Sequence, residues 1–313
     1  MNRWLKVLPF LAPGDSMRTF FSMSMFVVMT GLLLTSAGCG VDTAGPGKAP
    51  GAVAGGPPAV AGPKTYPIPP PDTSLSIDEY LKAGMPAPDR EWHSVDMETA
   101  DRILTSLTTT DYAALPRFQS SRSGAMFDRI TSRDNLVLFK TDALPNELRV
   151  PTFLAYYKSH NEIYKRYLSG YIQKKVTVNE LIELSGSTLR GSALLAELVN
   201  QFSPPLDKND PNFATRSQGL TQAKRGLAIT VGGALTMVSD TQNSPPSDRK
   251  RLLAALDETF PVILPELLEA SQTEIVTRLR TMSQSPDLQE LQPELGVLAE
   301  KAKALTERKK PTP

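Results

Sequence analysis

The sequence predicts an all-α fold, an irregular bundle of about six to eight helices from about Ser94 to Arg308. Three observations lead to this prediction. Apolar residues recur at steps of three and four through most of the region. Proline and hydroxyl or acidic side chains that are typical of helix starts precede several of these runs. The one short apolar segment that could be a strand, Leu136 to Phe139, has no obvious pairing partner, so it stays unassigned.

The first helices are short. Ile77 to Lys82 is a candidate short helix ahead of the bundle, and Gly124 to Ile130 a weaker one inside it. Between them lies a run of apolar residues at helical spacing: Met97, Ala100, Ile103, Leu104 and Leu107. We therefore expect the packed domain to begin near Ser94.

The strongest helix is predicted from Pro151 to Lys175, with the proline at the first helical position. Its aromatic residues fall on one face: Phe153, Tyr157, His160, Tyr164, Tyr167 and Tyr171. This face is a candidate binding surface, since aromatic residues carry much of the energy in interfaces. Burial in the core is the commoner fate of such a stripe, and on that interpretation His160 is structural.

The next helix opens with a capping box formed by Thr177 and Glu180. Gly186 and Gly191 are expected to weaken it and could divide it into two. Gly186 to Ser192 also looks like a phosphate loop, but it lacks the lysine and the preceding strand that such a loop requires.

A further helix is predicted from Asp210, as N-cap, to Val238. Its strongly apolar second half contains Gly232 and Gly233, which favours a buried central helix that a neighbour approaches closely. The apolar part is too short to cross a bilayer.

The last helices contain several prolines. Ser247 is the expected cap of the next helix, and Pro261 and Pro265 are expected to break or kink it. Pro293 should restart the final helix and not lie in its middle. Residues 309–313 form a short tail.

The N-terminal region has a different character. Arg18 precedes the apolar stretch Phe20 to Leu34, which is followed by small residues and by Cys39, the only cysteine of the chain. The sequence Ser36-Ala37-Gly38-Cys39 resembles the lipobox of a bacterial lipoprotein signal peptide. The resemblance implies cleavage after residue 38 and attachment of acyl chains such as palmitate at Cys39.

Lipidation at Cys39 implies a bacterial cell envelope protein that is bound to the membrane through its lipid. Gly40, and not an aspartate, follows the cysteine, which by the same resemblance favours the outer membrane. Two alternatives stay open: ordinary signal cleavage that releases a soluble protein, and an uncleaved N-terminal helix that anchors it. Met17 is an alternative start of the chain, because residues 1–16 contain prolines and an acid that are unusual in a signal.

Residues 39–93 are expected to form a tether. Gly, Ala and Pro make up most of Gly40 to Pro71, and such a composition cannot bury enough apolar surface to fold. It would average about 30 Å end to end as a coil and reach roughly 100 Å as polyproline helix. The domains are therefore 1–38 signal, 39–93 tether and 94–308 helical domain.

The composition argues against several functions. Lys+Arg number 34 and Asp+Glu 33, so the chain lacks the basic excess of a nucleic-acid-binding protein. The two histidines, His93 and His160, form no metal motif, and no catalytic motif or cofactor fingerprint occurs. We expect a non-catalytic envelope lipoprotein whose helical domain binds a protein partner or supports an assembly. The alternative is a small-molecule-binding or enzymatic domain in which the Tyr-rich helix forms a pocket wall.

Overall fold

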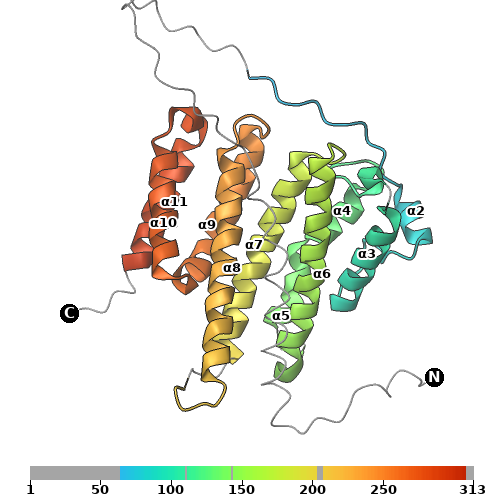
Figure 1. Ribbon diagram of the computed structural model, residues 1–313. Helices are drawn as coiled ribbons and strands as arrows, with labels where there is room; N and C mark the ends of the chain where they lie inside the picture. Colours follow the sequence, from blue (N-terminus) through green and yellow to red (C-terminus); the bar gives the residue numbers. More distant parts are fainter. Residues whose placement is uncertain (1–63, 110, 142–143, 203–206, 308–313) are drawn as a thin grey trace, which may run out of the picture.

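The computed structural model describes residues 64–109, 111–141, 144–202 and 207–307. Every regular element in these residues is helical, which confirms the predicted all-α fold (Figure 1). The seven described helices of 14 residues or more are α3 (Ser94–Leu107), α6 (Asn146–Ile172), α7 (Val178–Phe202), α8 (Phe213–Ser239), α9 (Pro246–Glu266), α10 (Glu269–Ser283) and α11 (Gln292–Glu307). The shorter elements are α2 (Ile77–Lys82), η1 (Tyr112–Ala114), α4 (Gly124–Thr131), η2 (Arg133–Leu136), α5 (Val137–Lys140) and η3 (Pro286–Leu291). The unassigned segment Leu136 to Phe139 is thus helical, and Cys39 lies outside the described residues.

Helix α7 is the centre of the bundle, with α6 on one side of it and α8 and α9 on the other (Figure 1). Its two faces belong to two separate hydrophobic cores. One, the aromatic core, joins α2 to α6 with the face of α7 that carries Leu184 and Leu198. The other, the aliphatic core, joins α8 to α11 with the face that carries Ile182 and Leu189. Because both faces of α7 are covered, most of its residues are buried.

Packing starts earlier in the chain than the predicted boundary at Ser94. Ser74, Tyr80, Met85 and Trp92 are all at most 3% exposed. The Tyr80 hydroxyl donates to the carbonyl of Ala114, and the Trp92 indole donates to the carbonyl of Ala87 at 3.0 Å. The residues from Ser74 to Trp92 are therefore part of the folded domain, and the proline-rich composition around them concealed this.

Helix α6 begins at Asn146 and not at Pro151, which lies inside it. The proline removes one backbone hydrogen bond, to the carbonyl of residue 147, in an exposed part of the helix. The helix ends at Ile172, because Lys174 adopts the left-handed conformation (φ 59°) and the backbone N–H groups of Lys174 and Lys175 cap its last turn.

Helix α7 is continuous, so the predicted break at Gly186 and Gly191 is wrong. A Cβ at Gly191 would lie 2.9 Å from the ring of Tyr157, so the glycine lets α6 and α7 approach closely. The predicted cap is present: the backbone N–H of Thr177 donates to the Glu180 carboxylate at 2.9 Å. Packing against two cores outweighs the low helix propensity of glycine here.

Helix α8 differs from its prediction in its N-cap and in its burial. Its N-cap is Asn212, because Asp210 caps the turn before it by accepting the backbone N–H of Asn212 at 2.8 Å. The helix is also peripheral and not buried: only Val231, Ala234, Leu235 and Val238 are buried. A Cβ at Gly232 or Gly233 would meet no atom within 4 Å, so no neighbour within the described residues approaches there.

The prolines of α9 do not break it. The helix runs from Pro246, preceded by Pro245 at the N-cap in place of the predicted Ser247, to Glu266. Pro261 frees the carbonyl of Asp257, and the ammonium group of Lys301 binds that carbonyl at 2.7 Å. Pro293 is the second residue of α11, as the sequence predicted. None of the described helices is long and apolar enough to cross a membrane.

Candidate functional site

The aromatic face of α6 is mostly closed by other helices. Phe153, His160 and Tyr167 are at most 1% exposed, and Tyr157 is 4% exposed. The other two, Tyr164 and Tyr171, are partly exposed. Four residues of the stripe therefore belong to the core, and Tyr164 and Tyr171 are accessible from the surface.

Ring contacts and hydrogen bonds hold the buried members in place. The Phe153 ring packs edge-on against Phe139 at 5.1 Å between centroids, and Tyr167 packs against Phe127 at 5.6 Å. The Tyr167 hydroxyl donates to the carbonyl of Pro116 at 2.7 Å. The rings of Phe153 and Tyr167 are thus packed within the core, so these residues have a structural role and do not form a binding surface.

His160 is enclosed in the same core. It lies 1% exposed beside Tyr156, whose ring it stacks on at 6.2 Å between centroids. Burial lowers the pKa of His160 to about 4, since removal from water disfavours the charged imidazolium. The imidazole is thus neutral near pH 7 and is shielded from solvent. The other histidine, His93, is exposed.

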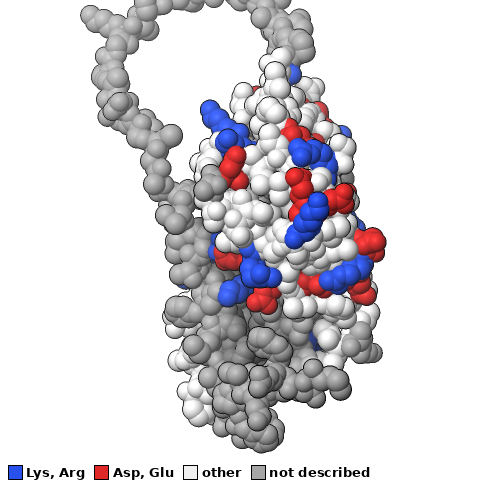
Figure 2. Space-filling model, turned by 90° about the vertical axis from the view of Figure 1, so that its right-hand side faces the viewer, with Lys and Arg blue, Asp and Glu red and all other residues white. Residues whose placement is uncertain are grey.

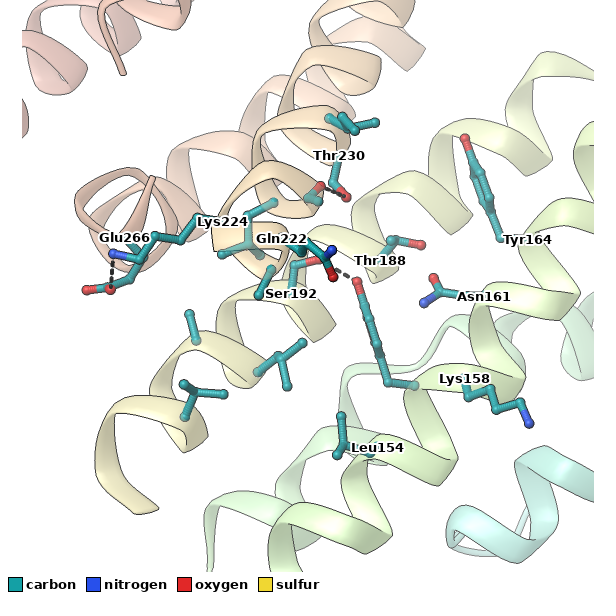
Figure 3. A pocket seen from close by; sticks show the side chains of 18 of the residues that line it. Leu154, Lys158, Asn161, Tyr164, Thr188, Ser192, Gln222, Lys224, Thr230 and Glu266 are labelled. Atoms are coloured by element: carbon teal, nitrogen blue, oxygen red, sulfur yellow. Dashed lines mark hydrogen bonds and ion pairs between the residues drawn. The ribbon is translucent and has the colours of Figure 1, made fainter. Parts of the chain in front are cut away.

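The open surface beside the aromatic stripe is a groove between α6 and α8, with α7 as its floor (Figure 3). Its volume is about 220 Å³. The apolar lining residues are Val150, Leu154, Leu168, Leu195, Ala196, Val199, Leu220, Ala223, Leu227, Ile229 and Ala234. Tyr157 and Tyr164 contribute the α6 wall, so two of the five tyrosine and histidine positions named from the sequence reach this groove. His160, Tyr167 and Tyr171 do not line it.

The hydroxyl groups of the groove are hydrogen-bonded within the protein. Tyr157 and Ser192 share a hydrogen bond of 2.6 Å, and Ser185 donates to the Tyr164 hydroxyl at 3.4 Å. The Thr188 hydroxyl, on the floor, donates to the carbonyl of Leu184 at 2.8 Å. Burial raises the pKa of both tyrosines, so they stay protonated. Because these hydroxyls already have partners, the groove offers a ligand mainly apolar contact.

Charged residues lie along the rim in pairs of opposite sign. Lys165 and Glu162 form an ion pair at 2.7 Å on α6, and Lys224 of α8 pairs with Glu266 at 3.8 Å across the far end. The Lys158 side chain extends away from the cavity in Figure 3. An apolar groove with a charged rim is the usual form of a protein-binding site.

The α8 wall of the groove was not identified from the sequence. Small residues form it at steps of three and four, Ala223, Gly226, Thr230 and Gly233. A signal was available, since Gly219, Gly226 and Gly233 recur every seven residues and therefore share one face of a helix. Small side chains on one wall leave room for the backbone of a bound helix.

A second cleft of about 440 Å³ lies between the start of η2, α7 and α9. Three arginines line it, but each is paired: Glu258 accepts from both Arg133 and Arg190 at 3.0 Å, and Glu183 lies 2.6 Å from Arg251. The ion pairs in this cleft connect α7 and α9 with the start of η2. The side of the molecule with α2 and α3 likewise has acidic and basic side chains interspersed (Figure 2).

Among the described residues, no three or more His, Cys, Asp and Glu side chains are grouped so that they could hold a metal ion. Comparison of the chain with protein-family models, with curated proteins and with solved structures found no match. The groove and the N-terminal sequence are therefore the features of the chain that bear on its function.

Proposed function

We propose that the chain is a non-catalytic lipoprotein of a bacterial cell envelope whose helical domain binds a protein partner, with a helix of that partner in the groove between α6 and α8. Acylation at Cys39 would hold the domain at the membrane, with the outer membrane favoured. The residues between Cys39 and the first described residue, Lys64, would act as the tether.

The shape of the groove is the observation that supports a protein partner. Its lining extends from Val150 to Leu168 on α6, which is about 27 Å of helix. Its volume of about 220 Å³ is nevertheless below the roughly 300–1,000 Å³ that is usual for small-molecule pockets. A long apolar groove suits the apolar side chains of a helix at successive turns.

The two tyrosines favour a second candidate, a small apolar molecule. Tyr157 and Tyr164 place two ring faces on one wall, which is the pocket wall that the alternative requires. Such a ligand would occupy part of the groove and leave the rest open.

A photo-reactive amino acid at Thr230, in the groove, distinguishes the two candidates. We expect irradiation in cells to attach a polypeptide at Thr230, with no such product from the matched position Val297, which is 68% exposed on α11. A co-purifying small molecule without a polypeptide adduct would favour the second candidate. Equal products at both positions would contradict the groove as a binding site.

The anchor has its own test. Cys39→Ala should move the mature protein from the detergent phase to the aqueous phase, because stable attachment of this kind requires acyl chains. The wild type keeps its own residues 1–38, and in the variant an ordinary cleavable export signal replaces them, so that the apolar stretch Phe20 to Leu34 is removed from both mature chains and does not itself bind membranes. Equal partitioning of variant and wild type would contradict lipidation.

A further inference from the structure

The outward face of α8 combines an exposed apolar side chain with glycines. Ile229, on the rim of the groove, is 45% exposed. Gly226 precedes it by three residues and Gly233 follows it by four, so both glycines lie on the same side of the helix as the isoleucine. An apolar knob thus stands between two positions without side chains.

Gly232 and Gly233 of α8 have no packing reason within the described residues. At Gly170 and Gly191, a Cβ would lie 2.7 Å from Val176 and 2.9 Å from Tyr157, so close packing requires glycine there. At Gly232 and Gly233 a Cβ would meet nothing within 4 Å. A helix face without side chains at these positions allows the backbone of another helix to come close.

We infer that α8 of one molecule packs antiparallel against α8 of a second copy of this chain, at the mouth of the groove. This inference rests on the proposed function and names the partner. With a two-fold axis near residue 231, Ile229 of each copy faces Gly233 of the other, so each knob enters the opposite gap. The contact is isologous, because one surface supplies both halves.

Charge on α8 supports a second copy in this orientation. The helix from Phe213 to Ser239 contains basic residues and no acid, whereas Asp240 follows directly at its C-terminal end. Arg225 is exposed and makes no ion pair among the described residues. In the antiparallel pair Arg225 faces residue 237 of the second copy, three residues or roughly 5 Å along the axis from Asp240. The negative end of that helix dipole lies at the same place.

Sedimentation velocity over a range of concentrations tests this inference. The chain from residue 39 with Cys39→Ser should associate to a dimer, and Gly233→Leu should weaken the association on the order of tenfold or more by filling the gap. Gly296→Leu is the matched control, since Gly296 on α11 also has no atom within 4 Å of a Cβ. Arg225→Glu should weaken the dimer and reduce its dependence on salt. Cooperative thermal unfolding at or above the wild-type melting temperature would show that the glycine variants still fold.

A monomeric wild-type chain at every concentration would overturn the inference, and so would equal weakening by Gly233→Leu and Gly296→Leu. The proposed function fails separately. A monomeric chain that still attaches a different polypeptide at Thr230 would retain partner binding and exclude the second copy as that partner. A dimer that is insensitive to Gly233→Leu would place the self-contact elsewhere, against the inference.

Discussion

The two cores that share α7 are built from different side chains. The aromatic core buries eight aromatic residues, Tyr80, Trp92, Phe127, Phe139, Phe153, Tyr156, Tyr157 and Tyr167. In the aliphatic core Phe260 is the one aromatic residue in the buried cluster, and Leu, Ile, Val, Ala and Met fill the rest. The backbone around the two cores differs as well: short helices and turns join α3 and α6 around the first, whereas α8 to α11 form most of the second.

The polar tips of the aromatic residues explain this difference. Tyr80, Trp92 and Tyr167 each donate to a backbone carbonyl outside the α-helices, at Ala114 in the last position of η1 and at Ala87 and Pro116 in the connecting segments. A buried ring with a donor can thus fix an irregular segment, because it satisfies a carbonyl that no helix satisfies. Aliphatic side chains have no such group, so the second core depends on regular helices whose backbone groups are already bonded.

The largest expected effect tests the role of the ring with a polar tip. Tyr167→Ala should lower the free energy of unfolding by about 4 kcal/mol, because it removes a fully buried ring and its hydrogen bond to Pro116. Chemical denaturation measures the loss. Phe260→Ala in the aliphatic core is the matched control, as it removes a buried ring without a hydrogen bond. We also expect Tyr167→Ala, and not Phe260→Ala, to expose residues 111–123 to protease; equal protection in both variants would contradict the difference between the cores.

The second expected effect is a pH dependence of stability that comes from His160, a buried titratable group beside the aromatic core. The pKa of His160 is about 4 in the folded protein and about 6.5 when unfolded, so the unfolded state binds the proton more tightly. The free energy of unfolding is therefore highest above about pH 6.5, where the imidazole is neutral in both states. It decreases by about 3 kcal/mol as the pH falls toward 4. His160→Gln should flatten this part of the stability profile.

Denaturation midpoints at several pH values between 7 and 4, measured for wild type and variant, give the comparison. His93→Gln is the control, because His93 is exposed. An identical slope in the wild type and in His160→Gln would show that His160 is not the group responsible.

The smallest effect compares glycines in the seam between the cores and at the surface. Gly191→Ala should lower stability by about 2 kcal/mol, since its Cβ would press into the Tyr157 ring at 2.9 Å. Gly296→Ala, on α11, should raise stability by about 0.5–1 kcal/mol, because a Cβ there meets nothing and alanine favours the helix. Thermal melts of both variants check the signs. Two changes of the same sign would contradict the assignment of Gly191 to close packing.

Local sequence patterns predicted much of the fold. The all-α class, the hydrogen bond from the Thr177 backbone to the Glu180 carboxylate that the predicted capping box requires, and the restart of the last helix at Pro293 are all present. These features depend on side chains within one or two turns of each other, so the sequence alone is sufficient to predict them. The signal peptide and the acylation of Cys39 stay predictions of the sequence, since residue 39 lies outside the described part of the chain.

Only the tertiary structure decided which interruptions of helix pattern matter. Gly191 and Pro261 look like breaks in the sequence, but Tyr157 fills the space at one and Lys301 binds the carbonyl freed by the other. Tertiary contacts also decided which residues of the aromatic stripe form the candidate site. Spacing placed the six aromatic positions on one face of α6, while the helices packed around it left Tyr157 and Tyr164 at the groove and buried Tyr167. Periodicity determines which side chains share a face, whereas exposure depends on neighbours that are distant in the sequence.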